Sequence, residues 1–128
     1  MIGLNQLDES IMLCETDAVL EGGKGKRFQV TAFGADSTAF SIRFGGVVHA
    51  YLNRCAHVPM ELDWTDGVFF DTSGSFLMCA THGALYSPTS GNCLGGPCNG
   101  KGLHKIQVVE KDGWIKWYPD ADVKPIIA

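Results

Sequence analysis

Apolar and polar residues alternate over short stretches along much of the chain, and glycine-rich turns separate these stretches. Three stretches rich in β-branched and aromatic residues lie in the first half of the chain, at residues 28–33, 39–44 and 47–53. Gly45-Gly46 separates the last two and is typical of a tight turn between paired strands. The recurrence of apolar residues every three or four positions that marks amphipathic helices is almost absent. This part of the chain is therefore predicted to form strands.

A second hairpin is predicted near the C-terminus. Residues 105–110 and 114–118 are again β-rich, and the turn between them contains Asp112-Gly113. An Asp-Gly pair suits a two-residue turn in which the backbone adopts positive φ angles. Strands at this spacing, without helices between them, predict an all-β fold: an antiparallel sandwich or small barrel.

The pattern changes over about residues 54–102, where short apolar pieces are separated by Gly, Pro, Asp and Ser. Four of the five cysteines lie in this segment. We expect it to form a small loop-rich subdomain inserted into the β scaffold. The 128 residues have room for one hydrophobic core, so residues 1–128 are expected to form a single domain.

Composition and charge exclude two classes of protein. With 45% hydrophobic and 19% charged residues the chain is expected to fold into a packed globule. The net charge is −4, and the basic cluster is limited to Lys24, Lys26 and Arg27. Because sequence-independent nucleic-acid binding needs a surplus of positive charge, nucleic acid is not an expected partner.

The N-terminal residues lack the basic start and apolar core of a signal peptide, and no apolar run approaches the roughly 20 residues that cross a bilayer. We therefore expect a cytoplasmic protein with no membrane partner. In that reducing compartment five cysteines are better explained as reduced thiols and metal ligands than as a disulfide framework.

Two short motifs combine cysteine with histidine. Cys55 and His57 form a C-x-H pair, Cys79 and His82 form a C-x-x-H pair, and 21 residues lie between His57 and Cys79. The short spacings allow one loop to present a thiolate and an imidazole together, and the long spacing allows two loops to face each other. Two sulfur and two nitrogen ligands are thus expected to converge.

Two kinds of metal centre accept this ligand set. One zinc ion would take all four ligands in a closed tetrahedral site. A [2Fe–2S] cluster with mixed ligands would instead place both cysteines on one iron and both histidines on the other. Structural zinc sites usually pair cysteine with cysteine and histidine with histidine, whereas each motif here mixes the two, so the spacing favours the cluster.

The motifs resemble the signature of the Rieske-type ferredoxins: C-x-H, a gap shorter than the one found here, C-x-x-H-G, and a third loop rich in Gly and Pro. Gly83 follows His82, and residues 94–97 read Leu-Gly-Gly-Pro. The resemblance covers the chain from about Leu13 to Tyr118. It implies a Rieske-like β fold and one [2Fe–2S] cluster, of which the cofactor-binding residues would be Cys55, His57, Cys79 and His82.

The same resemblance implies a single-electron carrier that passes electrons from a reductase to a terminal oxygenase or another redox enzyme. An enzyme is not expected, because the chain carries no nicotinamide or flavin fingerprint and lacks room for a second domain with a 2-His-1-carboxylate iron site. Two alternatives remain open: a small Rieske-like subunit of a reductase complex such as nitrite reductase, and a zinc-stapled β domain that binds proteins.

Some residues depart from high-potential members of the family. Ala84 stands where those members have a serine that donates to a bridging sulfide, and Met60 stands where they have a cysteine of an inter-loop disulfide, so a low potential is expected. Tyr86 matches a tyrosine that bonds a ligand sulfur, but it could equally be a core aromatic residue. The segment 59–74 is expected to add an acidic rim beside the cluster through its four acidic residues, Glu61, Asp63, Asp66 and Asp71.

The remaining cysteines and histidines are expected to be structural. Cys93 and Cys98 flank the third loop; a reducing cytosol favours two small buried thiols there over a disulfide that stiffens the loop. Cys14 is expected in the core. His49 and His104 lie on strands and are not spaced to join a ligand set.

Overall fold

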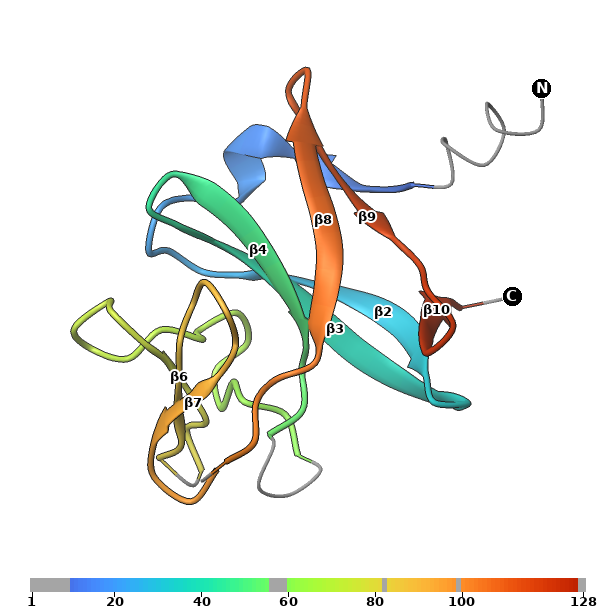
Figure 1. Cartoon of the computed structure of the whole chain (residues 1–128). Coiled ribbons are helices and arrows are strands. Elements are labelled where there is room, and N and C mark those ends of the chain that lie inside the picture. Colours follow the sequence, from blue (N-terminus) through green and yellow to red (C-terminus); the bar gives the residue numbers. More distant parts are fainter. Residues whose placement is uncertain (1–9, 56–59, 82, 99, 127–128) are drawn as a thin grey trace.

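The computed structural model describes residues 10–55, 60–81, 83–98 and 100–126, and Figure 1 shows that these residues form strands joined by turns, with no α-helix among them. The predicted all-β fold is confirmed. The elements in chain order are β1 (Ile11–Glu15), a 3-10 turn η1 (Thr16–Ala18), β2 (Lys26–Ala32), β3 (Ala35–Phe44), β4 (Val47–Leu52), β5 (Leu77–Met78), β6 (Leu85–Tyr86), β7 (Cys93–Gly95), β8 (Lys105–Lys111), β9 (Trp114–Tyr118) and β10 (Val123–Pro125). None of the described residues belongs to a helix long and apolar enough to cross a membrane.

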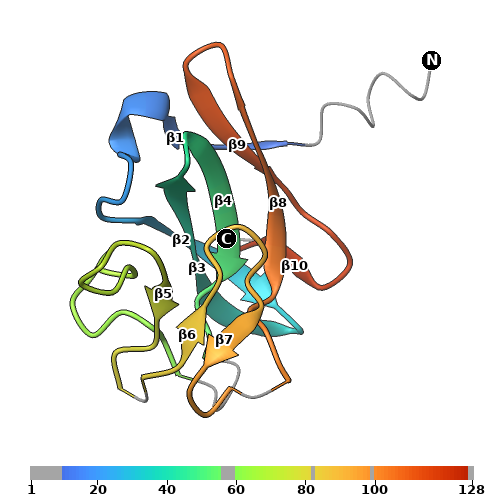
Figure 2. The ribbon, with the colours of Figure 1, turned by 60° about the vertical axis from the view of Figure 1, so that its left-hand side comes forward.

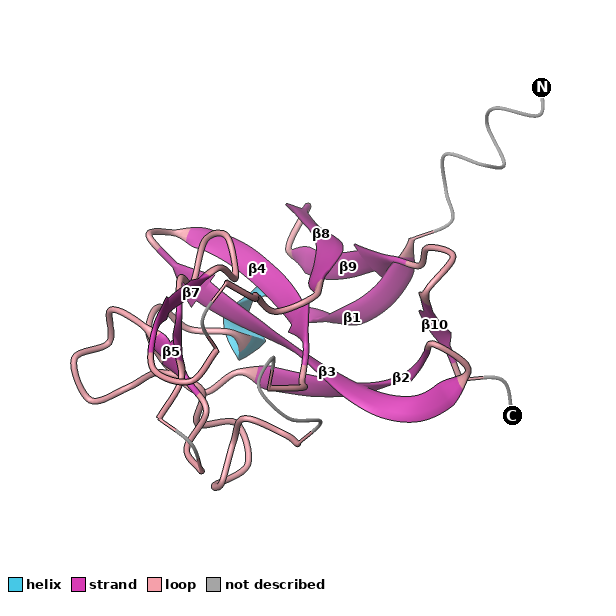
Figure 3. Cartoon of the chain, turned by 60° about the horizontal axis from the view of Figure 1, so that its bottom comes forward, coloured by secondary structure: helices cyan, strands magenta, loops and turns pink. Residues whose placement is uncertain are grey.

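Seven strands form one antiparallel sheet in the order β1-β9-β8-β4-β3-β2-β10. The link between β4 and β8 is short, with Ala50 opposite Ile106 and Tyr51 opposite Lys105. The sheet curls at this link, and Figure 3 shows β1 and β9 on the opposite side of the interior from β2 and β3. The seven strands therefore enclose a core of their own.

That core is filled by alternate side chains of the strands, because successive residues of a strand point to opposite faces. Its buried members are Val30, Ala32, Ala39, Ala50, Leu52, Ile106, Trp117 and Val123. The ring of Trp117 lies against that of Phe28, with centroids 5.2 Å apart.

The predicted turns are confirmed. Asp112 and Gly113 have φ angles of 55° and 85°, so this pair makes a two-residue turn with both residues left-handed, a conformation that Asp and Gly tolerate better than most residues. Some expected strand ends were wrong. Phe33, expected at the end of a strand, is a turn residue with a φ of 51°; β3 begins four residues before residue 39, and β4 ends at Leu52 and not at residue 53. Gly34, the neighbour of Phe33, completes the turn, and β3 begins at Ala35 because its exposed polar start still pairs with β2.

The other face of β3 and β4 carries a second core. Phe40, Ile42 and Tyr51 point away from the first core and pack against the segment between β4 and β8. The rings of Phe40 and Phe69 are stacked with their centroids 3.8 Å apart. Figure 2 shows the small sheet β5-β6-β7 of this segment beside the ends of β3 and β4. Burial on both faces explains why the middle of β3 is continuously buried.

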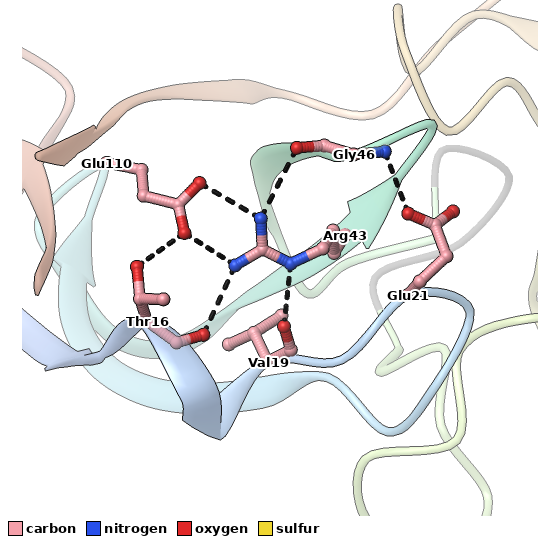
Figure 4. A network of polar contacts seen from close by, with 6 residues as sticks. All are labelled: Thr16, Val19, Glu21, Arg43, Gly46 and Glu110. Atoms are coloured by element: carbon pink, nitrogen blue, oxygen red, sulfur yellow. Dashed lines mark hydrogen bonds and ion pairs between the residues drawn. The ribbon is translucent and has the colours of Figure 1, made fainter. Parts of the chain in front are cut away.

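A polar network on the outside of the sheet fixes the segment that precedes β2 (Figure 4). Arg43 of β3 donates to the carbonyl oxygens of Val19 and Thr16 at 2.8 and 3.2 Å, and to the Glu110 carboxylate of β8 at 2.6 and 2.9 Å. Glu110 also accepts from the Thr16 hydroxyl. These bonds to Arg43 and Thr16 lower the pKa of Glu110 to about 2. Glu21 accepts from both backbone N–H groups of the β3–β4 turn.

Candidate metal centre

The two motif cysteines lie in the second core. Cys55 follows β4 and is 3% exposed, and Cys79 follows β5 and is fully buried. Their burial in one core, reached from two loops far apart in the sequence, agrees with the expected convergence of the motifs. His57 and His82 lie outside the described residues, so the complete ligand set stays a prediction.

The first loop is closed by a short backbone bond. The N–H of Cys55 donates to the carbonyl oxygen of Met60 at 2.7 Å. At the start of this loop the N–H of Asn53 donates to Thr38 of β3 at 2.8 Å. The position of Cys55 is thus tied to the scaffold two residues earlier and to its own loop five residues later.

The second loop is the tip of the β5–β6 hairpin, in which Met78 pairs with Leu85. The N–H of Cys79 donates to the carbonyl oxygen of Ala84 at 2.9 Å, and the N–H of Gly83 donates back to Cys79 at 2.8 Å. Ala80 and Thr81, which follow Cys79 at this hairpin tip, are exposed.

The third loop packs directly on the second. A Cβ atom at Gly96 would lie 2.9 Å from the carbonyl oxygen of Gly83 and 3.0 Å from the Cα of Ala84. Only glycine permits this approach, and its φ of 83° is also one that other residues rarely adopt. The Gly/Pro-rich composition of the third loop therefore has a steric cause at this position.

The third loop contains a disulfide between Cys93 and Cys98, so the expectation of two thiols was wrong. The strand β7 and the loop that follows it bring the two Cα atoms to 5.7 Å, within the range that a disulfide spans. Compartment chemistry, on which the expectation rested, carries no information about this distance. Cys98 is fully buried in the same core as Cys55 and Cys79, and the bridge therefore stiffens the loop beside them.

Tyr86 is hydrogen-bonded to a motif cysteine. Its hydroxyl lies 3.4 Å from the sulfur of Cys55, and both side chains are buried. A phenol donates readily to a thiolate, which carries the negative charge of a metal ligand. Of the two interpretations open from the sequence, a core aromatic or a partner of the ligand sulfur, the structure supports the second.

The acidic residues of the segment 59–74 form less of a rim than expected. Arg27 of β2 pairs with Glu61 at 2.8 Å and with Asp66 at 3.0 Å. Asp63 is buried and also faces Arg27. One guanidinium and three carboxylates leave this group with a net charge of −2. Asp71 accepts bonds from Ser73 and from backbone N–H groups, and these lower the pKa of its carboxyl.

The other histidines lie on the scaffold, as predicted. Burial and the nearby Lys105 lower the pKa of His49. His104 shares a corner of the scaffold with Asp120 and Asp122, and one ligand atom of each lies within 4.8 Å of the others. The sequence did not indicate this grouping, because the β8–β9 hairpin separates His104 from the two aspartates.

The residues described fit the sulfur half of a [2Fe–2S] ligand set. Two cysteines meet in one buried core, a hydroxyl faces one of them, and thiolates are the usual ligands of iron–sulfur clusters. The two cysteines share this buried core with apolar residues, Leu62, Phe69, Leu77 and Ala84 among them, and are themselves almost without exposed surface.

Comparisons with known proteins agree with this arrangement. The model of the family described as the Rieske [2Fe-2S] domain matches residues 9–119. The ferredoxin of carbazole 1,9a-dioxygenase from Nocardioides aromaticivorans IC177 is similar in fold, with a TM-score of 0.70 and 21% identity over 88% of this chain and 100% of that one. A ferredoxin of Sphingomonas yanoikuyae B1 has a TM-score of 0.66 and 20% identity over 87% and 99%. Comparison with curated proteins returns no match.

Similarity also extends to part of a larger protein. The terminal oxygenase of carbazole 1,9a-dioxygenase from Novosphingobium sp. KA1 has a TM-score of 0.69 and 20% identity over 94% of this chain, but only 32% of the oxygenase. At these identities the likenesses concern the fold.

Proposed function

Because the chain belongs to the Rieske [2Fe-2S] domain family, we propose that Cys55, His57, Cys79 and His82 bind one [2Fe–2S] cluster and that the protein is a carrier of single electrons. Such a cluster, when bound, takes up and releases one electron at a time. The observation that carries the proposal is the burial of Cys55 and Cys79 in one core, each at the start of a loop that its own N–H closes.

The residues around the two cysteines have separate tasks. Cys55 and Cys79 would supply thiolates to the cluster, and the imidazoles of His57 and His82 would complete the ligand set. The Tyr86 hydroxyl donates to the Cys55 sulfur and so favours the state with more negative charge on that sulfur. Ala84 offers no hydroxyl, which supports the expectation of a low potential.

We propose redox proteins as the partners: a reductase as donor and an oxygenase or other terminal enzyme as acceptor. One similar structure is described as a complex of reduced oxygenase and oxidised ferredoxin in carbazole 1,9a-dioxygenase, and the ferredoxin-like structures match over nearly their whole length. We propose no catalytic role for the chain itself.

We further propose that residues 1–128 form one domain with a cluster-binding subdomain over about residues 54–102, and that the protein is cytoplasmic. The first proposal agrees with the family match over residues 9–119. For the second, the Cys93–Cys98 bridge would have to survive a reducing compartment. Cys98 is fully buried, which shields its sulfur from thiol exchange, whereas Cys93 is half-buried.

The test is the metal content of the purified protein and of two histidine variants. The protein should carry two irons and two sulfides per chain and should be brown. His82→Ala should abolish cluster assembly, whereas the matched variant His49→Ala, at a histidine on the scaffold, should leave it intact. A colourless protein with one zinc ion, or equal loss in both variants, would contradict the proposal.

A further inference from the structure

Two buried polar side chains lie beneath the first loop. Asn53 is 4% exposed, and the side chain of Asp63 has no exposed surface. Burying a carboxylate costs several kcal/mol unless donors replace the lost water. A carboxylate at this position therefore needs an account of its partners.

Asp63 and Asn53 have partners for every side-chain oxygen. One oxygen of Asp63 accepts from Nδ2 of Asn53 at 2.9 Å. The other accepts from the N–H of Gly67 at 2.9 Å and lies 3.4 Å from Nε of Arg27. The amide oxygen of Asn53 accepts from the N–H of Leu62 at 2.8 Å. The arrangement therefore requires acceptor oxygens at position 63 and an amide at position 53 that donates to Asp63 and accepts from Leu62.

These contacts close the first loop on itself and connect it to two other parts of the molecule, the second loop and β2. The bonds from Asn53 to Leu62 and Asp63 join the two ends of the loop that contains Cys55. The carbonyl oxygen of Leu62 accepts from the N–H of Ala80, the residue after Cys79, at 2.9 Å. Arg27 belongs to β2 of the scaffold. A shift at Asp63 would therefore move the two cysteines relative to each other.

We propose that Asn53, Asp63 and Arg27 are positioning residues that hold Cys55 in register with Cys79 and thereby set how firmly the cluster is retained. The proposal rests on the proposed function, since it takes both cysteines as ligands. None of the three residues is itself a ligand. Their effect passes through the first loop, whose base they close, and through the contact of Leu62 with the second loop.

Exchanging the amide and the carboxylate gives a sharp test. In Asp63→Asn either orientation of the new amide makes an N–H group face another N–H group. In Asn53→Asp two carboxylates face each other. In the double variant the three hydrogen bonds are regained: the carboxylate at position 53 accepts from Leu62 and from the new amide, whose oxygen accepts from Gly67. The negative charge that faces Arg27 at position 63 is not regained, because a neutral amide stands there.

The measurement is the rate at which iron passes from the loaded protein to an excess of a chelator, with the EPR line positions of the reduced cluster as a second readout. Each single variant should release iron about tenfold faster than the wild type, because a buried polar group loses its partner. The double variant should return to within about threefold. The EPR lines should shift in the single variants and return in the double variant.

Glu110→Gln is the matched control, because it removes a carboxylate from an arginine-centred network on the scaffold. It should lower the unfolding temperature but leave iron release and the EPR lines unchanged. Wild-type release rates in the folded single variants, equal acceleration in Glu110→Gln, or no recovery in a folded double variant would each overturn the proposal. Failure of the proposed function would show differently, as a wild-type protein without two irons.

Discussion

The scaffold and the segment between β4 and β8 are stabilised in different ways. In the scaffold, β2 and β3 pair along seven residues, and apolar side chains of all seven strands meet in one core. In the segment, β5 and β6 pair along two residues, and the rest is held by side-chain contacts, a disulfide and loop-to-loop backbone bonds. In the scaffold many backbone hydrogen bonds share the stabilisation of each strand, whereas in the segment each loop depends on one or a few individual contacts.

The two regions therefore differ in how far their stability depends on a bound metal centre. The scaffold gains its stability from burial and ladder bonds that need no ligand. The segment has only two short strand pairs, β5–β6 and β6–β7, among its described residues, so the order of its loops depends on the contacts that link one loop to another. We therefore expect the scaffold to fold without the cluster and the segment to depend on it.

Removing the cluster should have the largest effect on stability, and the effect should be confined to the segment. When a metal site forms only in the folded state, the free energy of metal binding adds to the free energy of folding. In the cluster-free protein, hydrogen exchange in residues 53–103 should accelerate about a hundredfold or more, while β2, β3 and β4 keep their protection. Uniform acceleration in both regions would contradict the division.

Reducing the disulfide should have a smaller effect, again confined to the segment. A bridge that closes so short a loop contributes about 2 kcal/mol in the chain-entropy account. Cys98→Ser should lower the stability of the segment by about this amount, measured as faster iron release and faster hydrogen exchange in β6 and β7. Equal acceleration in β8 and β9 would show that the two regions unfold together.

Acid should test the scaffold network. Because the folded-state pKa of Glu110 is about 2, below its ordinary value of 4.5, its contribution is complete above the ordinary pKa. It is lost as the pH falls from about 4.5 to about 2. Solvent screening limits the contribution to about 1–2 kcal/mol.

Glu110→Gln should therefore lower the free energy of unfolding at pH 7 by about 1–2 kcal/mol and by much less at pH 2. Denaturant titrations across this range give the measurement. The same loss at both pH values would show that the variant removes packing and not a charge interaction.

Tyr86→Phe should have the smallest effect and should alter the redox centre without altering stability elsewhere. A Cys55 thiolate bound to the cluster has no proton to give, so it would accept from the Tyr86 hydroxyl 3.4 Å away, and this bond would favour the reduced state. A bond worth about 1 kcal/mol corresponds to about 40 mV for one electron. Protein-film voltammetry should show a potential lower by about that amount, and an unchanged or raised value would contradict the hydrogen bond.

The sequence predicted the scaffold better than the segment, because strand pairing and tight turns leave local signals in the sequence and loop-to-loop contacts do not. The strands at residues 28–33, 39–44, 47–53, 105–110 and 114–118 could be predicted because alternation and Asp-Gly or Gly-Gly turns are local signals. β1 and β10 carry weak alternation and owe their pairing to partners far along the chain.

The two motifs predicted the cysteines of the candidate site, but the sequence did not predict the side-chain contacts around them. Cys55 and Cys79 follow from the spacing of the two motifs, and both lie in one core. The buried Asp63 looked like a surface acid, because its donors come from Arg27 and Asn53, which no local pattern connects to it. The disulfide was missed for a similar reason: its distance is set by β7 and the loop after it.

The most direct test of the central claim, that two cysteines and two histidines bind one cluster, is pulsed EPR on the reduced protein carrying ¹⁵N-labelled histidine. We expect strong coupling of the cluster's unpaired electron to two histidine nitrogens. In His82→Ala, which should hold no cluster, we expect no cluster EPR signal. A reduced wild-type cluster without coupled histidine nitrogen would contradict the ligand assignment and, with it, the account of the site.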